Sequence, residues 1–256
     1  MEERLVTERN RGLNTTGLRT WGLLLLVLAA AGKALLQNRM LQMNGTTDLM
    51  AVLNAEGGMA IATVALILQA IEGCALPIFA FLAVEGSLHT SDFIKYMIRV
   101  AGLAVLTELP YNFAMSGKLL DLSDRNPVFA VALVLVLIYF YRRYEKKSIQ
   151  NLLIKFAVTA AAFVWALMLG IHHGAAFVLV SAVLWAMRGK PNLRNLVASS
   201  AMLVCCLISP FYLAAPMGFM FVHLYNGEKG PSKREVHYLV YPLALVLIGL
   251  IGTFCM

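Results

Sequence analysis

Long apolar runs, separated by short polar stretches, recur about every 20 to 30 residues along this chain. In lipid every backbone polar group must be bonded within its own segment, so apolar runs of this length are expected to be helices. The sequence does not show the alternating pattern of a membrane β-barrel. The expected spans lie at 18–37, 58–87, 97–116, 127–141, 150–169, 172–187, 194–209, 211–225 and 237–255. The pattern therefore predicts an all-α fold, a polytopic transmembrane helical bundle of about nine spans (eight to ten).

Composition supports a membrane protein. The chain has 256 residues, of which 60% are hydrophobic and only 14% are charged. A soluble domain of this size has too little polar surface to cover so much apolar material. The sequence therefore excludes an ordinary soluble enzyme and makes the lipid bilayer the first expected partner.

The distribution of charge sets the expected orientation. The formal net charge is +7, but the basic residues are strongly segregated between the two sides of the predicted bundle. With the N-terminus in the cytosol, the outer side carries only Lys33, Arg39, Lys118 and Arg125, which leaves 17 of the 21 Lys and Arg residues inside. The positive-inside rule predicts this asymmetry, and an odd number of spans then places the C-terminus outside. Because topology accounts for the surplus charge, nucleic acid is not an expected partner.

We expect one domain, because no Pro/Gly/Ser-rich linker and no internal repeat divides the chain. Residues 1–17 are polar and mixed in charge, so we expect a loosely held cytosolic arm before a transmembrane domain at 18–256. The first span also resembles a cleavable signal peptide, with arginines ahead of 23–28 and small residues at 29–31. We favour a retained span, because the apolar stretch continues beyond that point.

A group of ionisable and hydroxyl side chains follows the second expected span. Glu85 lies near the end of that helix, His89 and Thr90 follow in a turn, and two cations begin the next helix. Apolar segments seldom carry an acid that has neither a partner nor a task. A boundary imidazole can act as a general base, although structural pairing and an ordinary interfacial histidine are the alternatives. The catalytic candidates are His89, Glu85 and Thr90, and the candidates for binding a charged cosubstrate are Lys95 and Arg99.

The polar loop at 225–235 offers further binding residues. Tyr225, Asn226 and Gly227 end a helix, and a Gly-Pro pair followed by basic residues forces a turn. Basic side chains at a cytosolic mouth can hold the phosphates of a nucleotide-bearing cosubstrate, or they can serve only to set topology. Tyr225 and Asn226 therefore join the cosubstrate-binding candidates.

The remaining polar residues of the spans give weaker signals. Glu72 has no partner that is evident from the sequence, and Glu108 is expected in the outer half of its span. His172 and His173 fall in a short outer turn with no acid or cysteine at ligand spacing, so no metal site is expected. The cysteines lie in apolar segments and are expected to be small buried hydrophobes: Cys74, Cys205, Cys206 and Cys255.

Several segments together resemble the TraX family, which is placed with multi-span membrane acyltransferases that use cytosolic acetyl-CoA. The family pattern AFPIFAFLLVEG followed by hT corresponds to ALPIFAFLAVEGSLHT at 75–90, and KYLLRL corresponds to KYMIRV at 95–100. SEIPF corresponds to TELPY at 107–111, the YNG turn to YNGEKG at 225–230, and FYPLH to VYPLA at 240–244. The order and spacing of these segments agree over most of the chain.

The chain departs from the family pattern at polar positions. The Asp-His pair of the family's first helix corresponds to Ala29 and Ala30. The arginine of GRIAFP falls on Gly73, the histidine of YPLH on Ala244 and the aspartate of PFD on Asn112. Acyl transfer from a thioester needs a base for the attacking group and donors for the developing oxyanion. By this comparison the chain keeps the family's scaffold and the polar residues expected at the cytosolic end of the bundle. The residues that would act as the family's usual bases are replaced.

The resemblance implies an integral protein of the bacterial cytoplasmic (inner) membrane, with acetyl-CoA as cosubstrate and an acceptor that is a protein or a glycan. Conjugative members of the family are implicated in acetylating pilin. One alternative is a catalytically inert relative that serves as a scaffold or binds a partner, which the replaced bases favour. Another is a small transporter that uses Glu72 and Glu108, which the lack of a repeat weakens.

Overall fold

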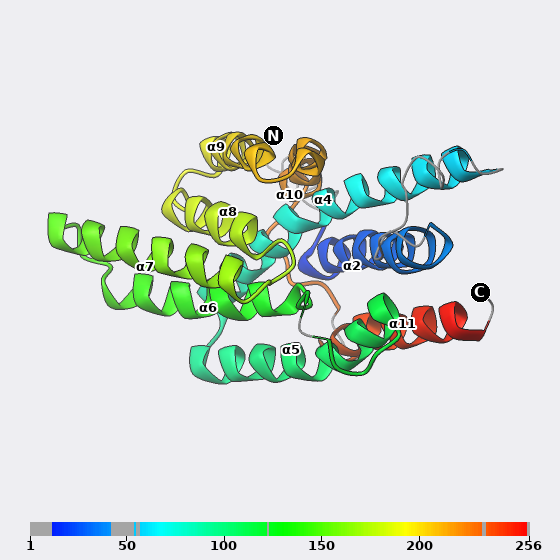
Figure 1. Ribbon diagram of the computed structural model, residues 1–256. Coiled ribbons are helices and arrows are strands. Elements are labelled where there is room, and N and C mark those ends of the chain that lie inside the picture. Colours follow the sequence, from blue (N-terminus) through cyan, green and yellow to red (C-terminus); the bar gives the residue numbers. More distant parts are fainter. Residues whose placement is uncertain (1–11, 42–53, 55–56, 122, 232–233, 255–256) are drawn as a thin grey trace.

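The computed structural model describes residues 12–41, 54, 57–121, 123–231 and 234–254, and it shows an all-helical bundle (Figure 1). The described residues contain isolated bridges but no strand. The longer helices are α2 (Thr15–Ala31), α4 (Gly58–His89), α5 (Phe93–Ser116), α6 (Val128–Arg143), α7 (Ile149–Met168), α8 (Gly174–Ala186), α9 (Pro191–Val204) and α11 (Arg234–Phe254). The shorter segments are η1 (Gly32–Met40), η2 (Cys205–Leu207), η3 (Pro210–Met217) and α10 (Gly218–His223).

Helix α4 is the centre of the bundle. Its 32 residues are apolar around most of the helix, so it has no polar face to expose and must be covered by other elements or by lipid. It packs against α2, η1, α6, α8, η3 and α10. Its second half is almost entirely buried, from Ala75 to Val84. The polar segment at 85–99 therefore begins where the buried half of α4 ends.

The structure confirms the predicted class of fold, because every expected span is helical. Among the described residues, four helical segments are long and apolar enough to cross a membrane: Thr15–Met40, Gly58–His89, Ile149–Met168 and His237–Phe254. Two shorter apolar helices accompany them, at Gly174–Ala186 and Leu193–Leu207. Helix α7 shows how the bundle meets lipid, because it buries few side chains and exposes large apolar ones such as Phe156 and Trp165.

The expected span at 211–225 differs from a regular helix. It begins as the 3₁₀ segment η3, which contains Pro210 and Pro216, and it becomes α-helical only from Gly218. Proline lacks the N–H that would continue the α-helical ladder, which explains why this segment is broken. The broken segment packs against α4, where the thiol of Cys74 donates to the carbonyl oxygen of Ala214 at 3.2 Å.

The described end of the expected N-terminal arm is ordered. Helix α2 begins at Thr15, inside the expected arm, and the Asn14 side chain caps it by accepting from the Gly17 N–H at 2.8 Å. The preceding backbone pairs with the loop after α10, through Leu13 N to Leu224 O at 2.7 Å and Asn226 N to Leu13 O at 2.9 Å. Residues 1–11 of that arm lie outside the described residues. The pairing fixes the 225–231 loop beside the start of α2.

Three basic side chains contact one end of the bundle. The Arg142 guanidinium lies 4.9 Å from the centre of the Phe93 ring, and Arg188 pairs with Glu145 at 2.6 Å. Arg194 lies 4.7 Å from the centre of the Phe81 ring. This is the end at which α4 finishes and α5 begins, so side chains predicted for the inner side gather around the polar segment at 85–99.

Gly218 provides a test of the packing between α4 and the broken segment. A Cβ added at Gly218 would overlap the carbonyl oxygen of Cys74 and the ring of Pro77, which cannot move away cheaply. We expect Gly218→Ala to lower the free energy of unfolding by about 1 to 3 kcal/mol, measured by thermal or denaturant unfolding in detergent. Gly102→Ala is the matched control, because an added Cβ there meets nothing within 4 Å and should not destabilise the helix.

Candidate functional site

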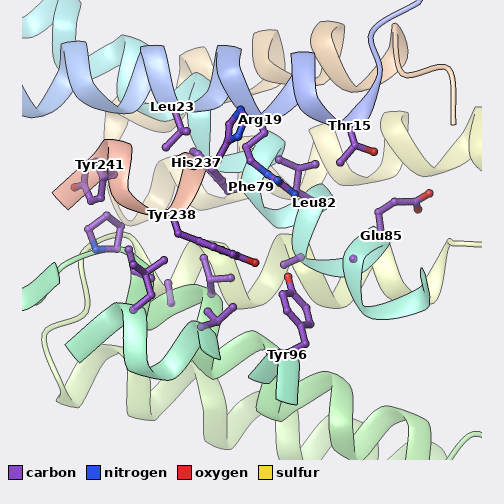
Figure 2. A pocket seen from close by; sticks show the side chains of 18 of the residues that line it. Thr15, Arg19, Leu23, Phe79, Leu82, Glu85, Tyr96, His237, Tyr238 and Tyr241 are labelled. Carbon is purple, nitrogen blue, oxygen red and sulfur yellow. The ribbon is translucent and has the colours of Figure 1, made fainter. Parts of the chain in front are cut away.

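A cavity of about 890 Å³ enters the bundle beside the end of α4 and continues to its interior. Side chains from α2, α4, α5 and α11 surround it, together with residues of α6, the α7–α8 turn and the loop after α10. Figure 2 shows Arg19 of α2, Tyr96 of α5 and Tyr238 of α11 directed into the same space. The cavity therefore links segments that are far apart in the sequence.

Glu85 and His89 lie at the mouth of this cavity, one helical turn apart on α4. The His89 Nδ1 atom lies 3.0 Å from the Glu85 backbone oxygen and 3.6 Å from its carboxylate Oε1. The Glu85 side chain is 18% exposed, whereas that of His89 is 58% exposed. The two side chains are therefore close to each other, but the imidazole faces solvent at the entrance.

The other candidates from this segment also line the mouth. Thr90 ends α4, and its hydroxyl donates to the Asp92 backbone oxygen at 3.4 Å. Asp92 caps α5 by accepting from the Lys95 N–H at 3.0 Å, and its carboxylate lies 3.1 Å from Lys95 Nζ. These bonds to Lys95 lower the pKa of the Asp92 carboxyl. Arg99 is exposed one turn further along α5 and lines the same cavity.

Tyr225 belongs to this mouth, whereas Asn226 has a structural role. The Tyr225 hydroxyl lies 3.4 Å from Glu85 Oε1 and 3.2 Å from Thr15 Oγ1, so it joins three segments. The Asn226 side-chain oxygen accepts from the Glu228 N–H at 2.9 Å, which forms a local turn. Tyr225 lines the cavity together with Gly227 and Lys229, but Asn226 does not.

The middle of the cavity contains polar groups that were not predicted from the sequence. Arg19, Tyr96 and Tyr238 point inward, and His237 lies beside them with its Nε2 3.5 Å from Thr20 Oγ1 (Figure 2). Tyr96 approaches α4 so closely that a Cβ at Gly86 would lie 3.1 Å from its hydroxyl. Gly86, which belongs to the family pattern, therefore leaves room for the Tyr96 side chain. This glycine was the signal in the sequence that could have identified Tyr96.

The inner end of the cavity holds a second cluster, made by Glu72, His172 and His173. Glu72 Oε1 lies 3.0 Å from His172 Nε2, and Glu72 Oε2 lies 3.5 Å from His173 Nε2. Glu72 comes from the middle of α4, and the histidines come from the turn between α7 and α8. Glu72, which has no partner that is evident from the sequence, therefore contacts both histidines. The histidines have no acid near them in the sequence, and α4 supplies one.

A shell of polar groups surrounds these histidines. Asp124 Oδ2 lies 3.4 Å from His172 Nδ1, and it also accepts from Lys33 Nζ at 2.7 Å and from the Tyr111 hydroxyl at 2.8 Å. Burial favours neutral side chains, but the contacts of Asp124 with His172 and Lys33 outweigh it and lower the pKa of the Asp124 carboxyl. Lys33 reaches this shell from η1, a π-helical continuation of α2.

The two histidines have different partners. His172 lies between two carboxylates, because its Nε2 faces Glu72 and its Nδ1 lies 3.4 Å from Asp124 Oδ2. The same Nδ1 lies 3.4 Å from Lys33 Nζ. His173 Nδ1 lies 2.7 Å from the Tyr212 hydroxyl. Adjacent residues of one turn therefore have different chemical surroundings.

Glu108 takes part in a separate network. Its Oε2 accepts from the Asn126 side-chain amide at 2.6 Å and from the Asn126 backbone at 3.2 Å, and its Oε1 lies 3.5 Å from Arg125 Nη1. Glu72 lines the large cavity, but Glu108 is not among its lining residues. The two carboxylates therefore do not line this cavity together, as a transport path along it would require.

Uncharged residues occupy the positions at which the chain departs from the family pattern. Ala29 and Ala30 are buried on α2, and Gly73 lies against the backbone of Phe211 in η3. Asn112 is buried on α5, and its amide nitrogen makes no hydrogen bond among the described residues. The ionisable groups inside this protein therefore come from other positions, chiefly from Glu72 and the histidine pair.

The comparisons with known proteins agree with the sequence motifs. A family model described as TraX protein matches residues 58–252, which include the segments around Glu72, the mouth and the histidine pair. No curated protein matches the chain, and no solved structure matches it. The matched region covers most of the 256 residues and almost the whole helical bundle after the first span. The chain therefore belongs to the TraX family.

Proposed function

We propose that this TraX-family protein is a membrane acyltransferase that uses acetyl-CoA. The observation that supports the proposal is a single cavity that has a cationic mouth and a buried Glu-His-His cluster at its other end. A cosubstrate with a polyanionic nucleotide at one end and a thioester at the other matches this division of chemistry. We propose acetyl-CoA because its phosphates would then lie beside the cations of the mouth and its thioester beside the buried cluster.

The phosphates would bind at the mouth. Lys95, Arg99 and Lys229 line the cavity there, beside the carboxylates of Glu85 and Asp92, and Arg19 lies further inside. Glu85 lies beside Tyr225 and His89, and Asp92 caps α5, so both acids are already occupied by protein partners. Cationic side chains bind phosphate through charge-assisted hydrogen bonds. Lys95 and Arg99 are therefore proposed to contact phosphate, with Tyr225 forming the adjacent wall.

The cavity has a suitable length for a pantetheine arm. Glu72 and Glu85 lie on the same helix, and their separation of 13 residues corresponds to a rise of about 20 Å. Between them the walls are largely apolar, with Leu76, Phe79 and Leu82 from α4 and Val131 from α6. An extended pantetheine chain is of this order of length. A nucleotide held at the mouth would place its thioester near the buried cluster.

Transfer would take place at the buried cluster. An acceptor amine or hydroxyl attacks the thioester carbonyl carbon, the new C–N or C–O bond forms, and the C–S bond breaks to release CoA thiolate. The acceptor must lose its proton, which the thiolate can finally take up. Glu72, His172 and His173 would surround the thioester and stabilise the charge that develops as this proton leaves. His89, the base expected from the sequence, is better placed to contact the cosubstrate at the entrance.

The proposed reaction requires the mouth to face the cytosol of a bacterial cell, where acetyl-CoA is found. The basic loops gather at that end of the bundle, which agrees with an N-terminus in the cytosol. We accordingly propose the inner membrane as the location, with about nine crossings. The acceptor would be a protein or a glycan that reaches the buried cluster.

The test of the proposed function is binding and turnover of acetyl-CoA by purified protein in nanodiscs. We expect saturable binding, release of free CoA when candidate acceptors are added, and access only from the cytosolic side in sided vesicles. Arg99→Ala should weaken binding by about 10-fold or more, because it removes a charge-assisted contact. Lys147→Ala is the matched control, since this exposed lysine lies in the α6–α7 loop and does not line the cavity.

An inert scaffold is the alternative, and the uncharged residues at Ala29 and Ala30 favour it. A scaffold would show neither saturable acetyl-CoA binding nor CoA release, although the protein remained folded and monodisperse. That result would reject the acyltransferase proposal. Binding that Arg99→Ala weakens and Lys147→Ala does not would reject the scaffold.

A further inference from the structure

We infer that Glu72, His172 and His173 form a binding site for a divalent transition metal of the Zn²⁺ class. This inference revises the expectation of no metal, and it goes beyond the proposed function because it concerns what the cluster binds, whatever reaction the protein performs. Two imidazoles and one carboxylate are a ligand set that zinc sites use when a fourth position stays open. The structure brings these three side chains together at one place.

The geometry of the cluster agrees with one ion bound by three ligands. One atom from each side chain can be chosen so that all three lie within 4.8 Å of one another. The shorter separations are 3.0 Å for Glu72 Oε1 and His172 Nε2, and 3.5 Å for Glu72 Oε2 and His173 Nε2. A tetrahedral ion with bonds of about 2.0 to 2.1 Å holds its ligand atoms about 3.3 Å apart. Small side-chain rotations would therefore complete the coordination.

The second ring nitrogens have the partners that metal-bound histidines require. A histidine that binds a metal through one nitrogen usually donates its other N–H to a carboxylate, a carbonyl or water, which fixes the ring. His172 Nδ1 lies 3.4 Å from Asp124 Oδ2, so a carboxylate orients this ring. His173 Nδ1 lies 2.7 Å from the Tyr212 hydroxyl. Both Nε2 atoms are thereby left to face Glu72.

An ordinary ion pair would explain the positions of Glu72 and His172, but not that of His173. A bond between Glu72 and His172 would satisfy those two groups without a metal. It does not explain His173, whose Nε2 is buried and makes no hydrogen bond among the described residues although it faces the same carboxylate. His173 also has a φ of 56°, the only positive φ among the described non-glycine residues. Such a conformation costs about 1 kcal/mol or more, and strained residues of this kind cluster at functional sites.

The donor set selects the class of ion. Imidazole nitrogen is a poor ligand for Mg²⁺ and Ca²⁺, which prefer oxygen, and a good ligand for Zn²⁺ and its neighbours. The local charges also suit a divalent cation, because metal-bound imidazoles are neutral and the two carboxylates of Glu72 and Asp124 then lie near the Lys33 ammonium group. Binding would release the proton that His172 Nε2 shares with Glu72. The three ligands line the large cavity, so a fourth position would open toward it.

The test is the metal content of the purified, full-length protein, measured without acetyl-CoA or any acceptor. The protein is stripped with chelator in detergent, equilibrated with Zn²⁺, desalted and analysed by mass spectrometry for metals. We expect about one Zn²⁺ per chain and a higher Tm than that of the stripped protein. Replacement of Zn²⁺ by Co²⁺ should give the visible absorption of a four-coordinate ion with nitrogen ligands.

The variants distinguish this site from adventitious binding. His173→Ala and Glu72→Gln should lose most of the bound Zn²⁺, and Tyr212→Phe should weaken binding by about 10-fold because it frees the second ring nitrogen of His173. His223→Ala is the matched control, since this exposed histidine of α10 does not line the cavity. Folded wild-type protein that retains less than about one tenth of an equivalent, with no change in Tm, would overturn the inference. Full occupancy in His173→Ala would also overturn it. Because metal content is read without turnover, either result is independent of the proposed reaction.

Discussion

Glu72→Gln is expected to reduce acetyl-CoA-dependent release of free CoA by about 100- to 1,000-fold, while the affinity for acetyl-CoA changes by less than about twofold. Glutamine keeps the shape of the side chain but removes the charge that holds His172 and His173. The mouth is separated from this position by about 20 Å of helix, so phosphate contacts should survive. Rates and dissociation constants are measured on the same nanodisc preparation.

Two further variants serve as comparisons for Glu72→Gln. Glu145→Gln alters an exposed pair with Arg188 outside the cavity, so its rate and affinity should equal those of the wild type. His89→Ala should weaken acetyl-CoA binding more than it slows release, because this exposed imidazole lies at the entrance. A wild-type rate in Glu72→Gln, or a loss of activity in His89→Ala at unchanged affinity, would move the reaction centre to the mouth.

Glu108→Ala should lower the free energy of unfolding by about 3 kcal/mol, because it leaves buried donors without an acceptor. The Asn126 side chain is fully buried, and both its amide and its backbone N–H donate to Glu108. Arg125 would lose its carboxylate partner as well. Denaturant or thermal unfolding in detergent measures the change.

The controls for Glu108 separate lost bonds from lost volume. Glu108→Gln keeps an oxygen that can accept from Asn126 and should cost less than the alanine variant. Glu145→Ala removes a carboxylate from an exposed ion pair and should cost less than about 1 kcal/mol. If Glu108→Ala were as stable as Glu145→Ala, the network around Asn126 would not hold α5 to the loop before α6.

Hydrophobic patterning predicted the helical segments well, because lipid allows few alternatives to a helix. All the expected spans are helical, and the longest is α4, as the pattern at 58–87 indicates. The broken segment at 211–225 was harder to predict, since apolar content alone does not show where Pro210 and Pro216 interrupt the ladder. The ordered start of α2 depends on pairing with a loop more than 200 residues away, which no local pattern reveals.

The mouth of the cavity could be predicted from the sequence, because the residues that line it are close together in the chain. Glu85, His89, Thr90, Lys95 and Arg99 lie in one local segment, and the structure brings them to one mouth. Their proposed roles in acetyl transfer remain predictions.

The buried cluster was missed because its members are distant in the chain. Glu72 and His172 are 100 residues apart, and their contact depends on how α4 and the α7–α8 turn face each other. The available signal was an isolated carboxylate within a span together with a histidine pair at a span boundary, two features that each lacked a local partner.

A structure of the protein in nanodiscs with acetyl-CoA bound tests most directly whether one cavity joins the cationic mouth to the buried cluster. We expect phosphate density beside Lys95 and Arg99, the pantetheine arm inside the cavity, and the thioester next to Glu72 and the histidine pair. Acetyl-CoA bound elsewhere, or with its thioester outside the bundle, would contradict the claim that one cavity joins the cationic mouth to the reaction centre.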